Sequence, residues 1–182
     1  SGGGIYGFEN ENYYYNNLIT GNEAPVEGGA ALHTADFYNN IFYKNKATEK
    51  GGGAGALVGR NVNNIFWQNE APESPQIINI DPEIPESLPE NCIIQEYDRE
   101  GTNIITSDPM FVNPSLEPPY DFSLLPGSPA IDAGTTISAV LQTLLPLIDY
   151  DNVDLEGQTR VFQSFPFIDP GPGAGIDIGA VE

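Results

Sequence analysis

A short phrase recurs three times in the N-terminal part of the chain and constrains its fold more than any other feature. Each copy has two asparagines, two apolar residues and, three positions later, a further asparagine; the copies cover residues 16–22, 39–45 and 63–69. A second phrase of Gly and Ala residues runs in phase with the first, at residues 2–5, 28–32 and 51–54. The period of 23 and then 24 residues is typical of stacked repeats, in which each repeat buries its core against its neighbours.

The residues within the repeats select one repeat architecture. Leucine-rich repeats need several Leu per repeat, and helical repeats need apolar residues at helical spacing over about ten positions or more. Here Gly and Asn interrupt every apolar run, and both residues disfavour helix interiors. Short runs such as Ile41-Phe42-Tyr43 and Ile65-Phe66-Trp67 suit strands bounded by turns. We therefore predict an all-β fold, a right-handed parallel β-helix, which is a solenoid of stacked coils.

The asparagines are expected at the corners of the coils, where Gly and Asn accept a positive φ at little cost. Asn side chains at the same corner of successive coils are able to form a hydrogen-bonded ladder. The alternative is that they are ordinary turn residues without a ligand role. The isoleucines that follow the Asn pairs, Ile41 and Ile65, are expected to stack in one interior row.

Changes in composition along the chain predict its domain organisation. Residues 1–70 hold three regular coils, and residues 91–113 predict one further irregular coil. Residues 71–90 are rich in Pro and Glu and predict a segment that mostly leaves the coil, with a short strand possible at residues 77–80. Cys92, the only cysteine, lies in an apolar run and is expected to be a buried small hydrophobe. Residues 114–182 predict a C-terminal capping region, because the end of a solenoid exposes unpaired backbone and apolar core.

Two structural features are expected within this cap. One short helix is predicted over residues 137–147, where apolar residues are spaced along one face. Arg160 is one of the few cations in the acidic C-terminal part, and a guanidinium is able to bind a carboxylate through two hydrogen bonds. Asp132 and Asp177 are its expected partners, so that the ion pair would act as a latch that holds the cap.

The charge of the chain restricts its partners. It carries 26 acidic and 6 basic residues, with a net charge of -20. Phosphate backbones and anionic membranes would repel such a chain, so nucleic-acid binding is not expected. The sequence has no apolar run long enough for a membrane-spanning helix.

One group of carboxylates is a candidate calcium site. Asp149, Asp151 and Asp154 stand close together in the sequence, and Ca²⁺ prefers oxygen ligands. The spacing of an EF-hand loop is not met, because position 153 is Val. The alternative is a structural turn, and no other cofactor is predicted.

Motifs in the C-terminal part resemble a known family. They are Asp-Pro-Met-Phe-Val at 108–112, Asp-Phe-Ser-Leu at 121–124, Pro-Gly-Ser-Pro-Ala-Ile-Asp-Ala-Gly at 126–134 and Gly-Ile-Asp-Ile-Gly-Ala-Val-Glu at 175–182. In this order, after the Gly- and Asn-rich repeats, they resemble the C-terminal part of large secreted bacterial right-handed β-helix proteins, known as choice-of-anchor or polymorphic-outer-membrane-protein-like repeat proteins. The resemblance implies an extracellular or cell-surface location, and it supplies no catalytic residue.

Enzymatic chemistry is a second possibility, because many β-helix proteins degrade acidic polysaccharides. Eliminating lyases use a cation to take a proton or to neutralise a uronate, and Lys44, Lys46 and Lys50 are candidates; the alternative is that they are solvated turn residues. Inverting hydrolases need two carboxylates about 6.5–9.5 Å apart, and no paired Asp recurs in adjacent coils. His33 is the only histidine and is expected to be an outward strand residue.

Two functional hypotheses follow. The first is a non-enzymatic extracellular or cell-surface protein, structural or adhesin-like and suited to a surface assembly, without a catalytic residue. Its expected partners are other surface proteins, further copies of the chain or a polysaccharide. The second is the C-terminal portion of a polysaccharide lyase or hydrolase whose active coils lie upstream.

Overall fold

The part of the chain that the computed structural model describes is built from strands and corners. The described residues are 4–6, 13–32, 35–55, 59–78, 87–135 and 178–179. Within them the fold is all-β with almost no helix, as predicted. The helix expected over residues 137–147 lies outside the described residues.

Most of the strands form four parallel sheets, named A to D here. Sheet A has the order β1 (Ile5–Tyr6), β5 (Ala31–Leu32), β9 (Ala54–Gly55). Sheet B has the order β12 (Pro89–Glu90), β10 (Asn61–Val62), β6 (Asp36–Tyr38), β2 (Tyr13–Tyr15). Sheet C has the order β13 (Ile93–Ile94), β11 (Ile65–Trp67), β7 (Ile41–Tyr43), β3 (Leu18–Thr20). Sheet D pairs β4 (Glu23–Ala24) with β8 (Lys46–Ala47), and an antiparallel hairpin joins β14 (Phe111–Asn113) to β15 (Asp121–Leu124).

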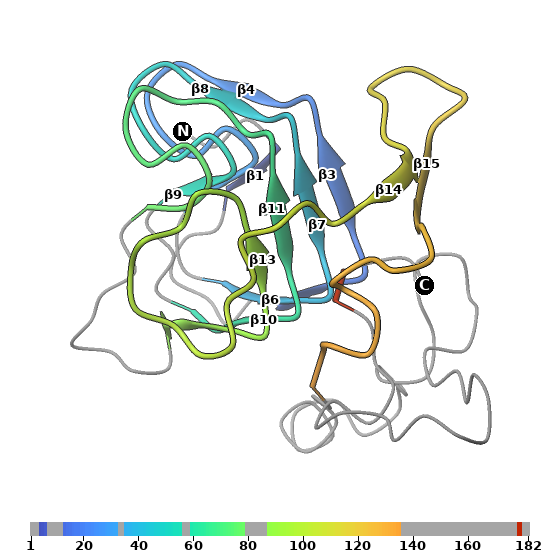
Figure 1. Cartoon of the computed structure of the whole chain (residues 1–182). Helices are drawn as coiled ribbons and strands as arrows, with labels where there is room; N and C mark the ends of the chain where they lie inside the picture. Colours follow the sequence, from blue (N-terminus) through green and yellow to red (C-terminus); the bar gives the residue numbers. More distant parts are fainter. Residues whose placement is uncertain are drawn as a thin grey trace.

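The order of the strands shows that the chain visits sheets A, B, C and D in turn and then returns to A. Each circuit, called a layer here, places its strands beside those of the previous one (Figure 1). The layers are residues 4–27, 28–50, 51–73, 74–98 and a short fifth layer, 99–105. The register follows the sequence repeat, because the residue after each Asn pair takes the same place in sheet C.

Part of the segment predicted to leave the stack stays within it. Glu73 forms a parallel bridge with Lys50, and Ile77 forms one with Ala54. Proline donates no backbone hydrogen bond but can still accept one: the carbonyl of Pro75 accepts from Gly53 at 2.9 Å. The chain therefore stays in the stack as far as residue 78, and the predicted domain boundaries remain a prediction.

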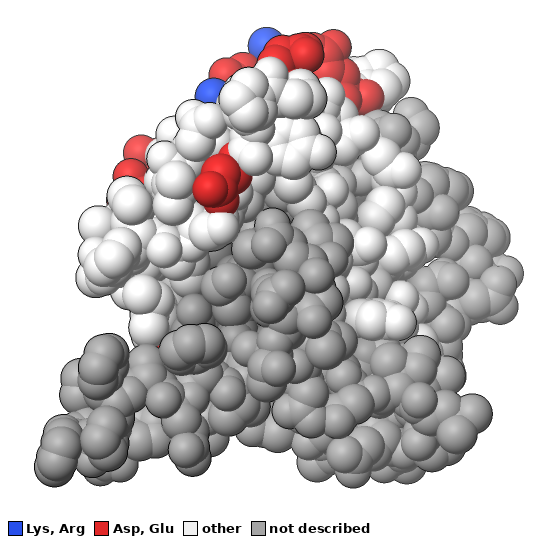
Figure 2. Space-filling view, turned by 90° about the vertical axis from the view of Figure 1, so that its right-hand side faces the viewer, with Lys and Arg blue, Asp and Glu red and all other residues white. Residues whose placement is uncertain are grey.

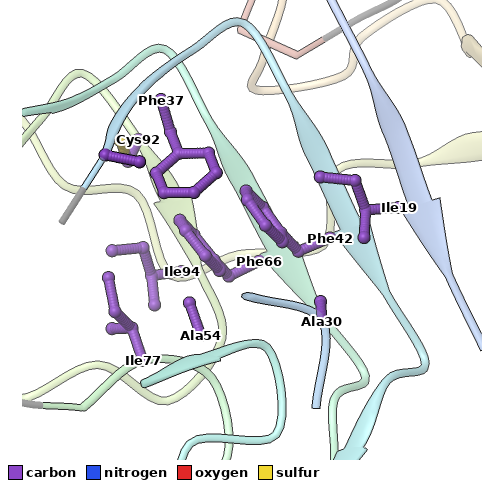
Figure 3. Close-up of a cluster of buried hydrophobic side chains, with 10 residues drawn as sticks. Ile19, Ala30, Phe37, Phe42, Ala54, Phe66, Ile77, Cys92 and Ile94 are labelled. Atoms are coloured by element: carbon purple, nitrogen blue, oxygen red, sulfur yellow. The ribbon is translucent and has the colours of Figure 1, made fainter. Parts of the chain in front are cut away.

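The interior of the stack is filled by aromatic and small apolar side chains. Phe42 and Phe66 stack in parallel, with ring centroids 4.4 Å apart, and Phe37 packs edge-on against Phe42. Ala54 of sheet A and Ala30, directly before β5, belong to the same cluster, and all five residues are buried (Figure 3). This row of phenylalanines, and not the isoleucine row, packs with the alanines of the first core cluster.

The isoleucine row was predicted correctly as a row but on the wrong side of the sheet. Ile41 and Ile65 are direct neighbours in sheet C and are fully buried. Alternate residues of a strand face opposite sides, so these isoleucines point away from Phe42 and Phe66. They are buried because a second segment covers the outer face of sheet C.

This covering segment consists of residues 110–135 with Ile178 and Gly179. Phe111 and Phe122 pack edge-on against Tyr43, at 6.3 Å and 5.2 Å between ring centroids. Gly179 has a φ of 113°, which favours glycine, and a Cβ added there would lie 2.9 Å from Cδ1 of Ile65. The outer face of sheet C thus forms a second core, which includes Trp67, Phe111, Phe122, Ala130 and Ile178.

Asparagine ladders fix the corners on both sides of sheet C, as predicted. In the first ladder, Nδ2 of Asn17 donates to Oδ1 of Asn40 at 2.9 Å, and Nδ2 of Asn40 donates to Oδ1 of Asn64 at 3.0 Å. In the second ladder the same bonds connect Asn22, Asn45 and Asn69, each at 3.0 Å. The first Asn of each pair adopts a left-handed conformation, with φ of 54° to 56° at residues 16, 39 and 63.

The first ladder ends on an unpredicted residue. Cys92 occupies the ladder position of the fourth layer, where its Sγ accepts from the backbone N–H of Asn64 at 3.4 Å. Asn91-Cys92-Ile93-Ile94 is therefore a fourth copy of the repeated phrase, with Cys in place of the second Asn. Cys92 is completely buried, as expected for a small hydrophobe.

Candidate functional site

An open groove of about 610 Å³ runs along the corner between sheets C and D. Two positions that repeat in successive layers supply most of its lining residues. Leu116, in the loop between β14 and β15, forms part of the lining and approaches the first layer: a Cβ added to Gly21 would lie 3.4 Å from Cδ2 of Leu116. The groove therefore lies between the stack and the hairpin.

The first column of groove residues directly follows sheet C. It contains left-handed residues with φ of 50° to 63°, which turn the chain toward sheet D: Gly21, Lys44, Gln68 and Glu96. Nζ of Lys44 lies 5.1 Å from the ring centroid of Tyr43, a cation–π contact. Because neighbouring strands lie about 4.8 Å apart, this column presents a polar side chain at a regular interval from the second layer on.

The second column lies at one register position of sheet D. Glu23 pairs with Lys46, and Lys46 forms a parallel bridge with Glu70. Nζ of Lys46 lies 3.2 Å from Oε2 of Glu70, and both side chains are more than half exposed. An exposed ion pair of this kind adds little to stability, so its two charges are available to a ligand.

Side-chain carboxamides also line the groove. Oε1 of Gln76 accepts from Nδ2 of Asn69 at 2.8 Å, which extends the second ladder by one residue. Oε1 of Gln95 accepts from the backbone N–H of Gln68 at 2.7 Å, and Oε1 of Gln68 accepts from the hydroxyl of Tyr43 at 2.9 Å. No described residue accepts a hydrogen bond from Nε2 of Gln68 or Gln95, so both amide groups remain as donors at the groove.

The groove thus combines ammonium and amide donors with carboxylate acceptors. Its donors are Lys44, Lys46, Gln68 and Gln95, and its acceptors are Glu23, Glu70 and Glu96. Figure 2 shows charged side chains gathered along the top of the described surface, with a mostly uncharged surface beneath them. Hydroxyl groups both donate and accept, so this mixture suits a hydroxyl-rich ligand better than a highly charged one.

The structure separates the cations that stand together in the sequence. Lys44 and Lys46 line the groove, whereas Nζ of Lys50 lies 3.8 Å from Oε1 of Glu27 outside its lining. The backbone N–H of Arg60 donates to Asp36, at the side of sheet B. His33 lies outside the described residues.

Most of the other predicted site residues also lie outside the described part of the chain. These are the calcium candidates Asp149, Asp151 and Asp154 and two latch residues, Arg160 and Asp177. Asp132 is described: it is half-buried within the covering segment and has a φ of 56°. Among the described residues, no three His, Cys, Asp or Glu side chains form a group that could hold a metal ion. The latch and the calcium site therefore remain predictions.

Buried groups outside the groove have strongly shifted acidities. Burial raises the pKa of the Cys92 thiol to about 12, so the sulfur is protonated at neutral pH. Burial, with a smaller effect of the neighbouring Asp36, also raises the pKa of Tyr38, whose hydroxyl donates to Oδ2 of Asp36 at 2.9 Å. Both shifts follow from positions inside the fold and leave neutral groups in place.

Sequence reasoning missed the glutamines and Leu116. Gln68 follows Trp67 in the way that Lys44 follows Tyr43, so the repeat itself carried a signal for this position. Leu116 had no such signal, because its place depends on how the hairpin folds back onto the stack. The ring of Tyr14 stacks on Phe37 inside the fold, at 5.2 Å between centroids.

Comparison of the chain with protein-family models, with curated proteins and with solved structures gives no match. Within the described residues, no helix is long and apolar enough to cross a membrane. The function is therefore argued from the geometry of the groove and of the stack.

Proposed function

We propose that the chain is a segment of a right-handed parallel β-helix that serves as a non-enzymatic structural and adhesive element, secreted or exposed on a cell surface. The supporting observation is the regular repetition of polar side chains along one open groove, above an interior filled by apolar residues. Connections between parallel strands are nearly always right-handed, which supports the proposed hand. Four sheets joined by ladders would form a stiff rod.

An adhesive role is supported by the shape of the groove. An enzyme pocket encloses most of its ligand, whereas this groove is open along the stack and would accept an extended chain. Its three carboxylates and two ammonium groups nearly balance, while the whole chain has a net charge of -20. We therefore favour a neutral, hydroxyl-rich polysaccharide over a polyanion, which the overall charge would repel.

The second candidate is the C-terminal portion of a polysaccharide lyase or hydrolase. The position of Lys46 beside Glu70 in a groove favours it, because proton transfer needs such groups within reach of a substrate. In this case the groove would continue into active coils upstream. The chain alone would then bind a polysaccharide only as part of a longer binding surface.

Binding to defined polysaccharides tests the proposal. The purified chain is immobilised and exposed to a soluble neutral β-glucan and, separately, to polygalacturonate, while both solutions are monitored for cleavage products. We expect reversible binding of the neutral polymer without cleavage. The double variant Lys46→Ala and Gln68→Ala should weaken this binding at least about tenfold, which corresponds to about 1.4 kcal/mol.

Lys50→Ala is the matched control, since Lys50 lies in the same stack but outside the lining of the groove. Equal losses in the control and in the double variant would contradict binding at the groove. Binding of neither polymer would contradict the adhesive role toward glycans. Cleavage of either polymer would favour the second candidate.

A further inference from the structure

The two ends of the ladders differ in hydrogen bonding. Within the stack, each ladder oxygen accepts two bonds from the preceding layer: Oδ1 of Asn40 accepts from the backbone N–H of Asn17 at 3.0 Å and from its Nδ2 at 2.9 Å. Oδ1 of Asn45 accepts the same pair from Asn22. No described residue donates to Oδ1 of Asn17 or of Asn22. The first layer therefore presents two amide oxygens whose equivalents in the second and third layers accept hydrogen bonds from the preceding layer.

Burial changes at the same place. Asn40 and Asn45 are completely buried, whereas the equivalent Asn17 and Asn22 are only half-buried. Ile41 is likewise completely buried, and the equivalent Leu18 is half-buried. Equivalent residues thus gain exposure in the first layer, as Ile104 and Ile105 do in the fifth, which is expected where no further layer covers them.

The hairpin extends past this end of the stack. Its strands β14 and β15 pack on Tyr43 of the second layer, while Leu116 in its loop reaches Gly21 of the first layer. Figure 1 shows the loop projecting beyond β3, on the side away from β7. Val112, Leu116 and Tyr120 are 46%, 45% and 53% exposed, which leaves apolar surface at this end.

A second copy of the chain is a poor occupant of this end. If the first layers of two copies faced each other, the unpaired amide oxygens of one copy would meet those of the other. Both groups are acceptors, so no hydrogen bond would form between them. Its last layers offer Cys92 and Ile104 at the first ladder position, and neither has a side-chain amide that could donate as Nδ2 of Asn does. A polypeptide layer with Asn at both corners supplies the N–H and Nδ2 donors that both oxygens accept elsewhere in the stack.

We infer that the β3 end of the stack, with the overhanging hairpin, is a docking surface for one further layer of the same repeat pattern. Such a layer would add a strand beside β3, donate from its two corner asparagines to Asn17 and Asn22, and place apolar residues of its own sheet C position beneath the hairpin. This inference rests on the stacked arrangement that underlies the proposed function. It specifies a polypeptide partner by its corner asparagines and not by its charge.

The test adds such a layer to the full chain. A copy of residues 27–49 is joined to Ser1, so that the Gly residues at 2–4 follow the copy as those at 51–53 follow residue 50. We expect amide hydrogen exchange at Leu18–Thr20 to slow by about tenfold or more. Oxidative footprinting should show a matching loss of labelling at Leu116 and Tyr120.

Two controls separate docking from a general effect of the extension. In the first, Asn40→Ala and Asn45→Ala are made in the added copy alone, and most of the protection should disappear. In the second, exchange is measured at β7 and β11 of the unextended chain. If β7 and β11 exchange slowly but β3 stays unprotected in the extended chain, the docking surface is wrong and the stack is not. If β7 and β11 exchange fast, the stack itself is wrong.

A further outcome would assign the surface to a different occupant. If labelling of Leu116 and Tyr120 in the unextended chain falls as its concentration rises, a second copy covers this end and the inference is wrong. Labelling that is independent of concentration, combined with protection in the extended chain, supports it.

Discussion

Asn45 shows what a single amide contributes to this fold. Its Nδ2 donates to Oδ1 of Asn69 at 3.0 Å and to the carbonyl of Ile19 at 2.8 Å, while its Oδ1 accepts two bonds from Asn22. We expect Asn45→Ala to lower the free energy of unfolding by several kcal/mol, because each buried polar group left unpaired costs about 1–3 kcal/mol. Urea denaturation measures the loss.

Asn22→Ala is the matched control for this prediction. Asn22 belongs to the same ladder, but it is half-buried and no described residue donates to its oxygen. Its loss should therefore be clearly smaller than that of Asn45→Ala. Equal losses would contradict an energetic role for the interior of the ladder.

Cys92 provides a prediction about pH. Burial raises the pKa of its thiol to about 12, so the folded state keeps the proton at a pH where the unfolded chain releases it. The associated stability is fully present below the ordinary pKa of a thiol and is lost as the pH rises from there toward 12.

We expect a thiol reagent to label Cys92 in the native chain only at the rate at which the chain unfolds. Rapid labelling under native conditions would contradict the burial of the thiol.

At the residue scale, the sequence predicted the corner asparagines because their spacing repeats. It did not predict that Cys92 and Gln76 end the two ladders. A thiol and a longer carboxamide replace the asparagine there, and neither replacement follows from the period.

Sheet C shows why the element scale was harder to predict. Residues 41–43 and 65–67 are apolar at every position. Alternate side chains of each strand face opposite sides of the sheet, but because both sets are apolar, the sequence does not indicate which side is interior. A shift of one residue moves every side chain to the opposite face. Both faces are apolar because one lines the interior and the other lies under the covering segment.

Substitutions on the two faces should therefore have different consequences. Phe66→Ala opens a cavity in the phenylalanine row and should cost about 3–5 kcal/mol, and Ile65→Ala should cost about 2–5 kcal/mol. Only Ile65→Ala removes the contact with Gly179, so it should also release the covering segment. Limited proteolysis would then cut residues 125–135 faster in Ile65→Ala than in Phe66→Ala when the two are compared at equal stability.

The opposite order of cleavage would place Ile65 inside the stack and would contradict the assignment of the two faces. Hydrogen exchange at Ala133 and Thr135 offers an independent measurement. The backbone N–H of Thr135 donates to Oδ1 of Asn63 at 2.9 Å, and Nδ2 of Asn63 donates back to its carbonyl at 2.7 Å. Release of the covering segment should expose this pair.

At the scale of the whole molecule, local repeats specify the stack, and a distant segment completes it. The covering segment runs back from the fifth layer to the first, where Leu116 forms part of the groove. The repeat therefore allowed the stacked parallel strands to be predicted, but not the groove. The remainder depends on contacts between residues far apart in the sequence, which no local pattern encodes.

The central claim is that equivalent residues of successive repeats lie directly on one another. Nuclear Overhauser effects in the isotope-labelled chain test it most directly. We expect contacts between the rings of Phe42 and Phe66, whose centroids are 4.4 Å apart, and between the side-chain amides of Asn17, Asn40 and Asn64. Contacts confined to neighbours in the sequence, with none between residues 23 or 24 positions apart, would contradict the stacked fold.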